Sequence, residues 1–280
     1  MMNAICTYGG KRKMFHIFHF QQLSESDIER YRQHLECPNP KCAATAYFRR
    51  ASVDGKSACF GSRYHVFGCS EGRASLQLER ATKHVREVEQ IIEDSEAVVF
   101  DFSTPTPKKK LSLVQPSKSR SAGPSAAQFH AGKVTGIRNP VLDMEKALDS
   151  LMLGSSLAQS DTIITIDGRY PYKAKNLFVN FADTEPEENL KTVHPKMFWG
   201  TISHCDAAME WLNPAGCDDV GIPIKKHRDK LFKRFDIVKA QDVEGAGIIL
   251  FGKCFWNAQK SRKIIDLWNE NRIYMSFDEH

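Results

Sequence analysis

The sequence lacks any run of 18 apolar residues, so we expect no membrane-spanning helix. Its first 20 residues, MMNAICTYGGKRKMFHIFHF, lack the basic-then-apolar layout of a secretory signal, and the expected location is the cytoplasm. The chain also has no GxxxxGKS or GxxxxGKT loop, no GxGxxG that opens a helix, no GxSxG and no HExxH. These absences exclude the common nucleotide-binding, hydrolase and metallopeptidase signatures.

Acidic residues are missing from one long stretch, residues 102–142, which is also rich in proline, serine, lysine and arginine. Low hydrophobicity with proline, serine and glycine is typical of a flexible linker. We therefore predict an N-terminal domain over residues 1–101, a basic linker over 102–141 and a C-terminal domain over 142–280. The linker lysines either keep the chain soluble or make non-specific contacts to phosphate groups.

The residues that are present indicate a folded protein. Hydrophobic residues make up 41% of the 280 residues, which is enough for a packed core. The net charge of +5 is compatible with a polyanionic partner such as nucleic acid. The eight cysteines, in a reducing compartment, favour thiols or metal ligands over disulfides.

Four cysteines and one histidine lie close together, between Cys37 and Cys69. Zinc takes four sulfur or nitrogen ligands in a closed tetrahedral site, and such sites usually combine two close pairs. The four predicted ligands of a structural zinc ion are Cys37, Cys42, His65 and Cys69. Cys59 is an alternative to His65, although a single cysteine on a strand is more often a buried hydrophobic residue. No glutamate adjoins His65 as in a deaminase, so we do not expect the zinc to be catalytic.

The segment between the two pairs is predicted to form a β-hairpin with its turn at Asp54-Gly55. With its flanking ligands, this segment resembles the small Cys-Cys-His-Cys zinc region of bacterial competence-type proteins, over about residues 35–70. In that family the region is sometimes joined to a nuclease domain. The usual nuclease signature, an Asp and a separated Glu-x-Lys on adjacent strands, is not recognisable here. The resemblance therefore implies the zinc ligands and not catalysis.

The hairpin also carries aromatic and basic residues side by side. Aromatic rings beside arginines suit base stacking and phosphate contact. The alternative is that the rings form the core of the module while the arginines are solvated. The candidate nucleic-acid contacts in this module are Arg49, Arg50, Arg63 and Tyr64.

Residues 160–277 are predicted to contain about five strands, with the basic helix KKHRDKLFKRFDI between the third and the fourth. This order resembles an OB-fold, a five-stranded Greek-key barrel. Gly200, Gly245, Gly247 and Gly252 are expected where strands of such a barrel bend.

The resemblance to OB-folds implies single-stranded nucleic-acid binding on strands 2 and 3 and the adjoining loops. All four tryptophans of the chain lie in this region. For any single aromatic residue, packing in the core is the alternative. The candidate contacts are Lys173, Lys175, Phe178, Trp199, Trp211, Lys253, Trp256, Arg262 and Lys263.

The expected fold class is α+β, with a small zinc-binding N-terminal domain and a mainly β, OB-like C-terminal barrel. The expected function is non-enzymatic binding of nucleic acid, single-stranded DNA in particular, as an accessory to DNA processing, mobile-element transfer or phage defence. Other proteins of a DNA-processing complex are further possible partners. Two alternatives stay open: a nuclease or nuclease subunit with a diverged active site, and a protein–protein adaptor.

Overall fold

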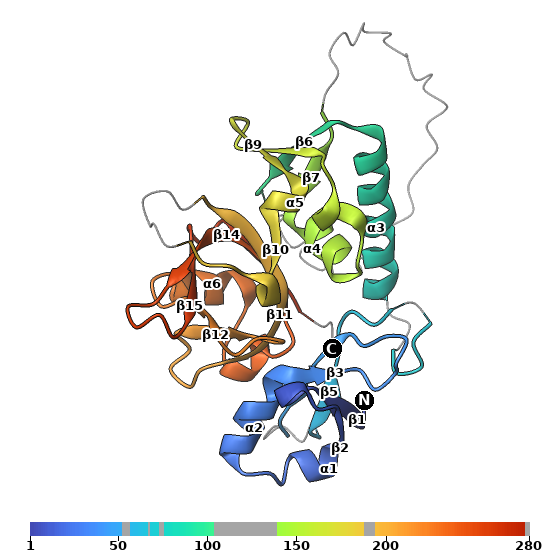
Figure 1. Ribbon diagram of the computed structural model, residues 1–280, viewed down its shortest axis with the longest axis vertical. Coiled ribbons are helices and arrows are strands. Elements are labelled where there is room, and N and C mark those ends of the chain that lie inside the picture. The colour runs from blue at the N-terminus through green and yellow to red at the C-terminus, as the bar shows by residue number, and fades with distance from the viewer. Residues whose placement is uncertain (52–56, 67, 73–75, 104–138, 188–193, 278–280) are drawn as a thin grey trace, which may run out of the picture.

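The computed structural model describes residues 1–51, 57–66, 68–72, 76–103, 139–187 and 194–277. These residues form three parts: an N-terminal module, a layer of helices on a small sheet, and a closed β-barrel (Figure 1). Helices and strands are mixed, as the sequence predicts. No helix in the described part of the chain is long and apolar enough to cross a membrane.

The N-terminal module is an antiparallel sheet packed with two short helices. The strand order is β2-β1-β3-β4-β5. The elements are β1 (Asn3–Cys6), β2 (Lys13–His16), α1 (Ile17–Phe20), α2 (Glu25–Tyr31), β3 (Leu35–Glu36), β4 (Thr45–Arg49) and β5 (Cys59–Gly61). Helix α2 begins after Ser24, whose hydroxyl accepts a hydrogen bond from the Asp27 amide at 3.2 Å. Phe20, Phe48 and Phe60 are buried together and form the module's core.

The second part is a four-stranded sheet of order β7-β6-β8-β9, covered by helices. The strands are β6 (Ala97–Asp101), β7 (Val141–Asp143), β8 (Ile163–Ile166) and β9 (Tyr170–Lys173), and the helices are α3 (Leu76–Asp94), α4 (Met144–Met152) and α5 (Ala174–Leu177). Strand β6 runs parallel to β7 and to β8. The buried side chains of His84 on α3 and Asp149 on α4 join the two helices at 2.7 Å.

This sheet crosses the domain boundary that the sequence suggested. Strand β6 precedes the predicted linker at residues 102–141, whereas β7 lies at its end and β8 follows it. Residues 104–138, most of that linker, lie outside the described residues. The division expected at residue 102 therefore separates strands that pair with each other, and the barrel begins later in the chain than residue 142.

The barrel is closed by five strands in the order β11-β12-β13-β15-β14, with β14 pairing back to β11. The elements are β11 (Lys196–Cys205), β12 (Trp211–Pro214), β13 (Val220–Pro223), α6 (Arg228–Phe235), β14 (Gly247–Trp256) and β15 (Lys263–Leu267). Strands β10 (Phe178–Asn180) and β16 (Ile273–Ser276) extend the same sheet. The barrel core includes Ile202, Leu212, Ile222, Ile248 and Ile265. The predicted helix between the third and fourth barrel strands is α6.

Short 3-10 helices connect several of these elements. They are η1 (Tyr8–Gly10), η2 (Arg32–His34), η3 (Ser156–Gln159), η4 (Phe181–Asp183) and η5 (Ala240–Val243). Two of them, η2 and η5, lie where the N-terminal module meets the barrel.

Two glycines that we expected at strand bends lie where the N-terminal module approaches the barrel. A Cβ on Gly245, whose φ is +75°, would lie 2.2 Å from the Tyr47 ring. A Cβ on Gly247 would lie 2.5 Å from the Tyr64 hydroxyl. Both tyrosines are buried. These glycines therefore make room for two rings of the N-terminal module against the barrel.

A buried ion pair joins the same two parts. Arg32 Nη2 lies 2.5 Å from Glu244 Oε1, and both side chains are only 5% exposed. Ser203 donates its hydroxyl hydrogen to the Arg32 carbonyl at 3.2 Å, and the Gln33 amide donates to the Pro214 carbonyl at 2.9 Å. Buried charges are tolerated only when they are paired, so this contact fixes the module on the barrel in one arrangement.

His204 lies at the edge of this contact, with its Nε2 3.1 Å from Glu29 Oε2. The charged groups that face His204 are Glu29, Arg32, Asp206 and Arg262. Burial first, and the Arg32 charge second, lower the pKa of His204 to about 4, while Glu29 opposes the shift. The imidazole is therefore neutral in the folded protein at neutral pH.

The lowered pKa of His204 predicts acid sensitivity. In the unfolded chain His204 binds a proton near pH 6.5, whereas in the folded protein it does so only near pH 4. The free energy of unfolding is therefore unaffected by this group above pH 6.5 and falls by up to about 3 kcal/mol as the pH drops towards 4. The free energy of unfolding, measured by denaturant titration from pH 7.5 to pH 4, tests this. In His204→Gln this contribution should vanish. An identical pH profile for the variant and the parent would contradict it.

Candidate functional site

The clearest candidate site is a cluster of three cysteines and one histidine in the N-terminal module. Its members are Cys37, Cys42, His65 and Cys69, and their ligand atoms all lie within 4.8 Å of one another. The Cys37 and Cys69 sulfurs are 3.7 Å apart, and Cys42 Sγ lies 3.4 Å from His65 Nδ1. A disulfide needs about 2.05 Å between sulfurs, so these are free thiols around one point. The four residues predicted as ligands are thus brought together in a geometry that can hold a metal ion.

Tight turns on both sides position the four ligand atoms. The Cys42 amide donates to the Asn39 carbonyl at 2.9 Å, and the turn continues through Ala43 with φ +44°. On the other side the Cys69 amide donates to the Val66 carbonyl at 3.0 Å. Gly68, whose φ is +79°, supplies the positive φ that we expected beside a ligand. Each pair is therefore folded by its own short loop.

Amide donors lie around the cluster, although burial raises the pKa of the Cys37 thiol to about 12. The Val66 amide donates to Cys42 Sγ at 3.4 Å, and the Asn39 side-chain amide donates to Cys69 Sγ at 3.5 Å. Burial raises the pKa of Cys69, but amides of residues 71 and 72 and the two neighbouring thiols outweigh it, so that this pKa lies below its usual value. Such outer donors orient the ligands of a metal site and stabilise thiolates.

His65 is partly desolvated and closely packed by the chain behind it. Burial lowers the pKa of its imidazole, which leaves the ring neutral and able to offer a lone pair to a cation. A Cβ on Gly72 would lie 3.0 Å from His65 Cβ, so the chain passes closely behind this side chain. Replacing Gly72 would press on the histidine.

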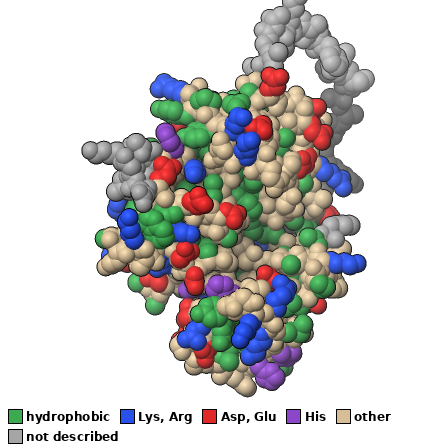
Figure 2. All heavy atoms as spheres, viewed as in Figure 1, with side chains coloured by type: hydrophobic (Ala, Val, Ile, Leu, Met, Phe, Trp, Pro, Cys, Tyr) green, Lys and Arg blue, Asp and Glu red, His purple; other side chains and the backbone are tan. Residues whose placement is uncertain are grey.

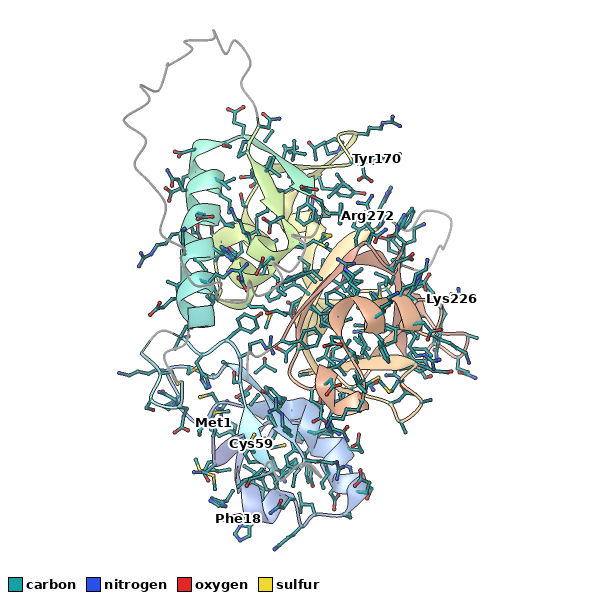
Figure 3. All side chains as sticks on the ribbon, turned by 180° about the vertical axis from the view of Figure 1, so that it is seen from behind. Met1, Phe18, Cys59, Tyr170, Lys226 and Arg272 are labelled. Carbon is teal, nitrogen blue, oxygen red and sulfur yellow. The ribbon has the colours of Figure 1, made fainter. Side chains whose placement is uncertain are left out.

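Cys59, the alternative ligand, does not belong to the cluster. It lies on β5, opposite Arg49 of β4, in the predicted hairpin (Figure 3). The predicted turn at Asp54-Gly55 lies outside the described residues. Three other cysteines are buried in the barrel, and burial raises the pKa of each to about 12. They are Cys205, Cys217 and Cys254, and they pack as small hydrophobic residues.

A second group of predicted residues meets on the outside of the barrel, over strands β12 and β13. The Arg262 guanidinium lies 5.3 Å from the centre of the Trp211 ring. Its Nη2 donates to Asn213 Oδ1 at 2.6 Å and to the Val220 carbonyl at 3.3 Å. A Cβ on Gly221 would lie 2.7 Å from Arg262 Nε, so the absence of a side chain at Gly221 gives the guanidinium space to lie against the strand. Leu212 points into the core between them, which places Trp211 and Asn213 on the other side of the strand, where Arg262 covers Asn213 and leaves it only 9% exposed.

Other predicted barrel residues lie near this face or beyond it. Lys263 Nζ pairs with Asp219 Oδ2 at 3.0 Å. Trp256 lies opposite Lys263 across the β14–β15 ladder and is partly exposed. Lys253 Nζ lies 5.7 Å from the ring centre of Trp268. Each of these groups is therefore accessible at the edge of the barrel surface.

Two predicted contacts lie in the interior instead, and a third is partly buried. Phe178 is only 3% exposed and packs in the core shared by the sheet and the barrel. Tyr64 is buried against Gly247, and Trp199 packs on the same core as Phe178 with its Nε1 buried. The Phe178 and Tyr64 rings are unavailable for base stacking in this structure, because neighbouring parts of the chain cover them, whereas Trp199 stays partly exposed.

The remaining predicted basic residues lie at the surface with protein partners. Arg50 pairs with Glu25 on α2, and Arg49 lies over the Tyr47 ring at 5.9 Å. Arg63 donates to the Ser276 hydroxyl at 3.2 Å, across the contact between module and barrel. Lys173 and Lys175 both pair with Asp161, at 2.8 and 3.0 Å. Their charges are thus partly compensated.

Among the described residues, the face of the molecule that Figure 2 shows has no large patch of purely basic side chains. There, Lys and Arg side chains lie among Asp and Glu side chains over all three parts. A continuous basic patch therefore does not define a binding surface on that face, and specific groups such as Arg262 with Trp211 carry more information.

No protein family, curated protein or solved structure was found to match this chain. Two aspartates near the strands of the second part are paired with basic side chains, Asp161 with two lysines and Asp167 with Arg272. Within the described ranges, the cysteine–histidine cluster is the one group of metal-binding side chains that lie this close together.

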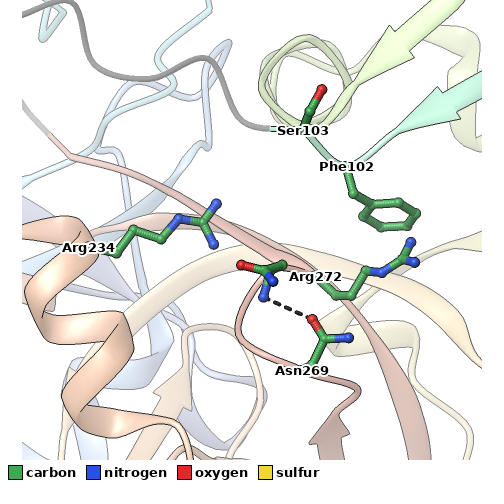
Figure 4. A pocket seen from close by; sticks show the side chains of 6 residues that line it. Phe102, Ser103, Arg234, Asn269 and Arg272 are labelled. Atoms are coloured by element: carbon green, nitrogen blue, oxygen red, sulfur yellow. Dashed lines mark hydrogen bonds between the residues drawn. The ribbon is translucent and has the colours of Figure 1, made fainter.

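The sequence patterns did not point to Arg272 or Phe102, which lie together between the sheet and the barrel (Figure 4). The sequence feature that could have indicated Arg272 is the polar run Asn-Glu-Asn-Arg at residues 269–272, which lies between two apolar strands. Its relation to Phe102 depends on tertiary structure, because the two segments are far apart in the chain.

Proposed function

We propose that this chain binds single-stranded nucleic acid on the outer face of barrel strands β12 and β13, and that a structural zinc ion holds its N-terminal module. The observation that carries the proposal is the placement of Arg262 over Trp211, beside Asn213, on this face. The group combines a ring, a cation and an amide.

The strand order supports the choice of this face. The first barrel strand, β11, pairs with both β12 and β14, and the third, β13, runs parallel to the fifth, β15. Helix α6 lies between the third and fourth strands. This arrangement is similar to that of an OB-fold, in which strands 2 and 3 and the neighbouring loops bind single strands. Here those strands are β12 and β13, and the residues before β15 supply Arg262.

The chemistry of the face suits a single strand. Every base offers a flat π-face that stacks on an indole ring, so recognition by Trp211 tolerates any sequence. A guanidinium such as that of Arg262 binds phosphate oxygens with two parallel hydrogen bonds. Binding of this kind requires no catalytic group.

Zinc fits the cysteine–histidine cluster by distance and by ligand type. Tetrahedral zinc, with bonds of about 2.3 Å to sulfur and about 2.0 Å to nitrogen, places two sulfurs roughly 3.8 Å apart and a sulfur and a nitrogen about 3.6 Å apart. The sulfur–sulfur distance of 3.7 Å and the sulfur–nitrogen distance of 3.4 Å are close to these values. A closed set of four protein ligands leaves no open position, so the ion would stabilise the module rather than act in catalysis.

Fluorescence anisotropy with labelled single-stranded oligonucleotides tests the barrel face. Trp211→Ala should weaken binding about 5- to 150-fold, since one stacked base contributes about 1–3 kcal/mol. Arg262→Gln should also reduce the dependence of log K on log salt by about 0.7, because one phosphate contact is lost. Tyr170→Ala is the matched control, because Tyr170 is an exposed ring, 58% accessible, away from this face.

The thermal unfolding of each variant shows whether the barrel is intact. Trp211→Ala and Arg262→Gln variants that remain folded and bind oligonucleotides like the parent would contradict the proposed face. Binding that does not change with salt would contradict a nucleic-acid function of any kind at this surface.

A further inference from the structure

A cavity of about 510 Å³ lies between the helix-covered sheet and the barrel (Figure 4). Its lining comes from three segments: the end of β6, helix α6 and the loop between β15 and β16. The lining residues are Phe102, Ser103, Arg234, Asn269, Asn271 and Arg272. The cavity opens beyond the carboxyl end of β6, which is the central strand of three parallel ones. Ligands of open α/β sheets bind at this end of the strands.

Arg272 is fixed on one side of the cavity. Its guanidinium lies 3.7 Å from the centre of the Phe102 ring, and its Nη2 binds both carboxylate oxygens of Asp167, at 2.8 and 2.7 Å. The side chain is only 17% exposed. Its Nη1 is buried and has no hydrogen-bond partner among the described residues. A buried donor without a partner destabilises the fold unless a ligand or water satisfies it.

Arg234 faces the same cavity from α6 (Figure 4). Its Nη1 donates to the Glu270 carbonyl at 2.6 Å, which holds the guanidinium near the loop. Burial lowers the pKa of this group, which shows that its charge is partly desolvated. The Asn271 amide donates to Asn269 Oδ1 at 2.9 Å, so the loop that carries the two asparagines is itself ordered. Two guanidinium groups and two amides thus line one small volume.

Aromatic rings lead from the cavity to the surface. The Phe102 and Phe251 rings are 5.6 Å apart, and the Phe251 and Trp268 rings are 6.0 Å apart. Trp268 ends this row and is 52% exposed, beside Lys253. An exposed indole next to a lysine suits stacking by a nucleobase. Trp268 also directly precedes the cavity-lining Asn269 in the sequence.

We infer that this cavity binds the phosphate monoester of a nucleotide, with Arg234 and Arg272 contacting the phosphate and Trp268 stacking on the base. Arginine forks match phosphate oxygens, and the cavity brings two guanidinium groups to one volume, one of them only 17% exposed. Asp167 neutralises part of the positive charge of Arg272, which weakens its attraction for phosphate. We therefore expect stacking of the base to contribute to the affinity as well. This site shares no residue with the barrel face proposed above and does not depend on it.

Isothermal titration of the full chain with AMP, adenosine and inorganic phosphate tests this site. AMP should bind more tightly than either adenosine or phosphate. Arg272→Met and Arg234→Met should each weaken AMP binding at least tenfold, and Trp268→Ala should weaken AMP binding while leaving phosphate binding unchanged. Arg169→Met, which alters an exposed arginine outside the cavity lining, is the matched control.

A 5′-phosphorylated and a 5′-hydroxyl oligonucleotide identify the source of the phosphate. Preference for the phosphorylated oligonucleotide, lost in Arg234→Met, would assign the site to a strand end, whereas binding of AMP alone would assign it to a free nucleotide. Either result supports the inference. Equal affinity for AMP and adenosine, binding of no phosphate compound, or unchanged affinity in both folded arginine variants would overturn it.

Discussion

Replacing Cys37 with serine is expected to abolish metal binding by the cluster and to unfold the N-terminal module. Cys37 is buried, and its sulfur lies 3.7 Å from that of Cys69 within the cluster. Closed zinc sites of this type contribute roughly 10–16 kcal/mol of apparent binding energy at neutral pH, so losing one ligand removes much of what holds such a module. Metal analysis of the purified protein should give one zinc per chain for the parent and close to none for Cys37→Ser.

Cys59→Ser is the matched control for this prediction. Cys59 lies in the same module as Cys37 and has the same side chain, but it is outside the cluster. The Cys59→Ser variant should bind zinc and resist proteolysis like the parent protein. Removing zinc from the parent with a chelator should make it as sensitive to proteolysis as Cys37→Ser. Zinc retained in Cys37→Ser, or lost in Cys59→Ser but not in His65→Ala, would show that the ligand set is wrong.

Removing Arg32 is expected to separate the N-terminal module from the barrel. In Arg32→Met, Glu244 would remain buried without its partner, which typically destabilises a protein by roughly 3–5 kcal/mol. Burial already raises the pKa of Glu244, and the Arg32 charge opposes this effect, so the variant carboxyl should take up a proton at still higher pH. Denaturant unfolding followed by circular dichroism measures the loss.

A second substitution distinguishes the charge from simple packing. Arg32→Met combined with Glu244→Gln should recover most of the stability, because no uncompensated charge is then buried. Arg30→Met is the control: Arg30 is nearly half exposed and its pairing with Asp27 at 3.2 Å contributes at most about 1 kcal/mol. A double variant no more stable than Arg32→Met would mean that packing, and not the buried charge, explains the effect.

The sequence predicted the metal cluster well because its determinants are local. Two pairs of ligands, each within one short loop, fix their own geometry, and a single cysteine on a strand falls outside it. Strand β11 and helix α6 were likewise predictable, since their apolar and basic patterns are continuous.

The sequence could not show which rings are covered by another part of the chain. Tyr64 and Phe178 are aromatic residues of the kind that stack on bases, but packing between distant segments buries them and partly covers Trp199. The same holds for Gly245 and Gly247, whose role depends on tyrosines about 180 to 200 residues earlier in the chain. The β6–β7–β8 sheet was missed because its strands are short and pair across an intervening stretch without apolar periodicity.

That sheet also limits how this gene can be recombined. Strand β6 is central, with hydrogen bonds to β7 on one side and β8 on the other, yet it is encoded before residues 104–138 while both partners are encoded after them. An exchange between genes that broke within that stretch would give one product with a strand open on both edges and another without its middle strand. In composition residues 104–138 resemble a linker between two domains. We nevertheless expect the segments on either side of them to be inherited together, because they form one sheet.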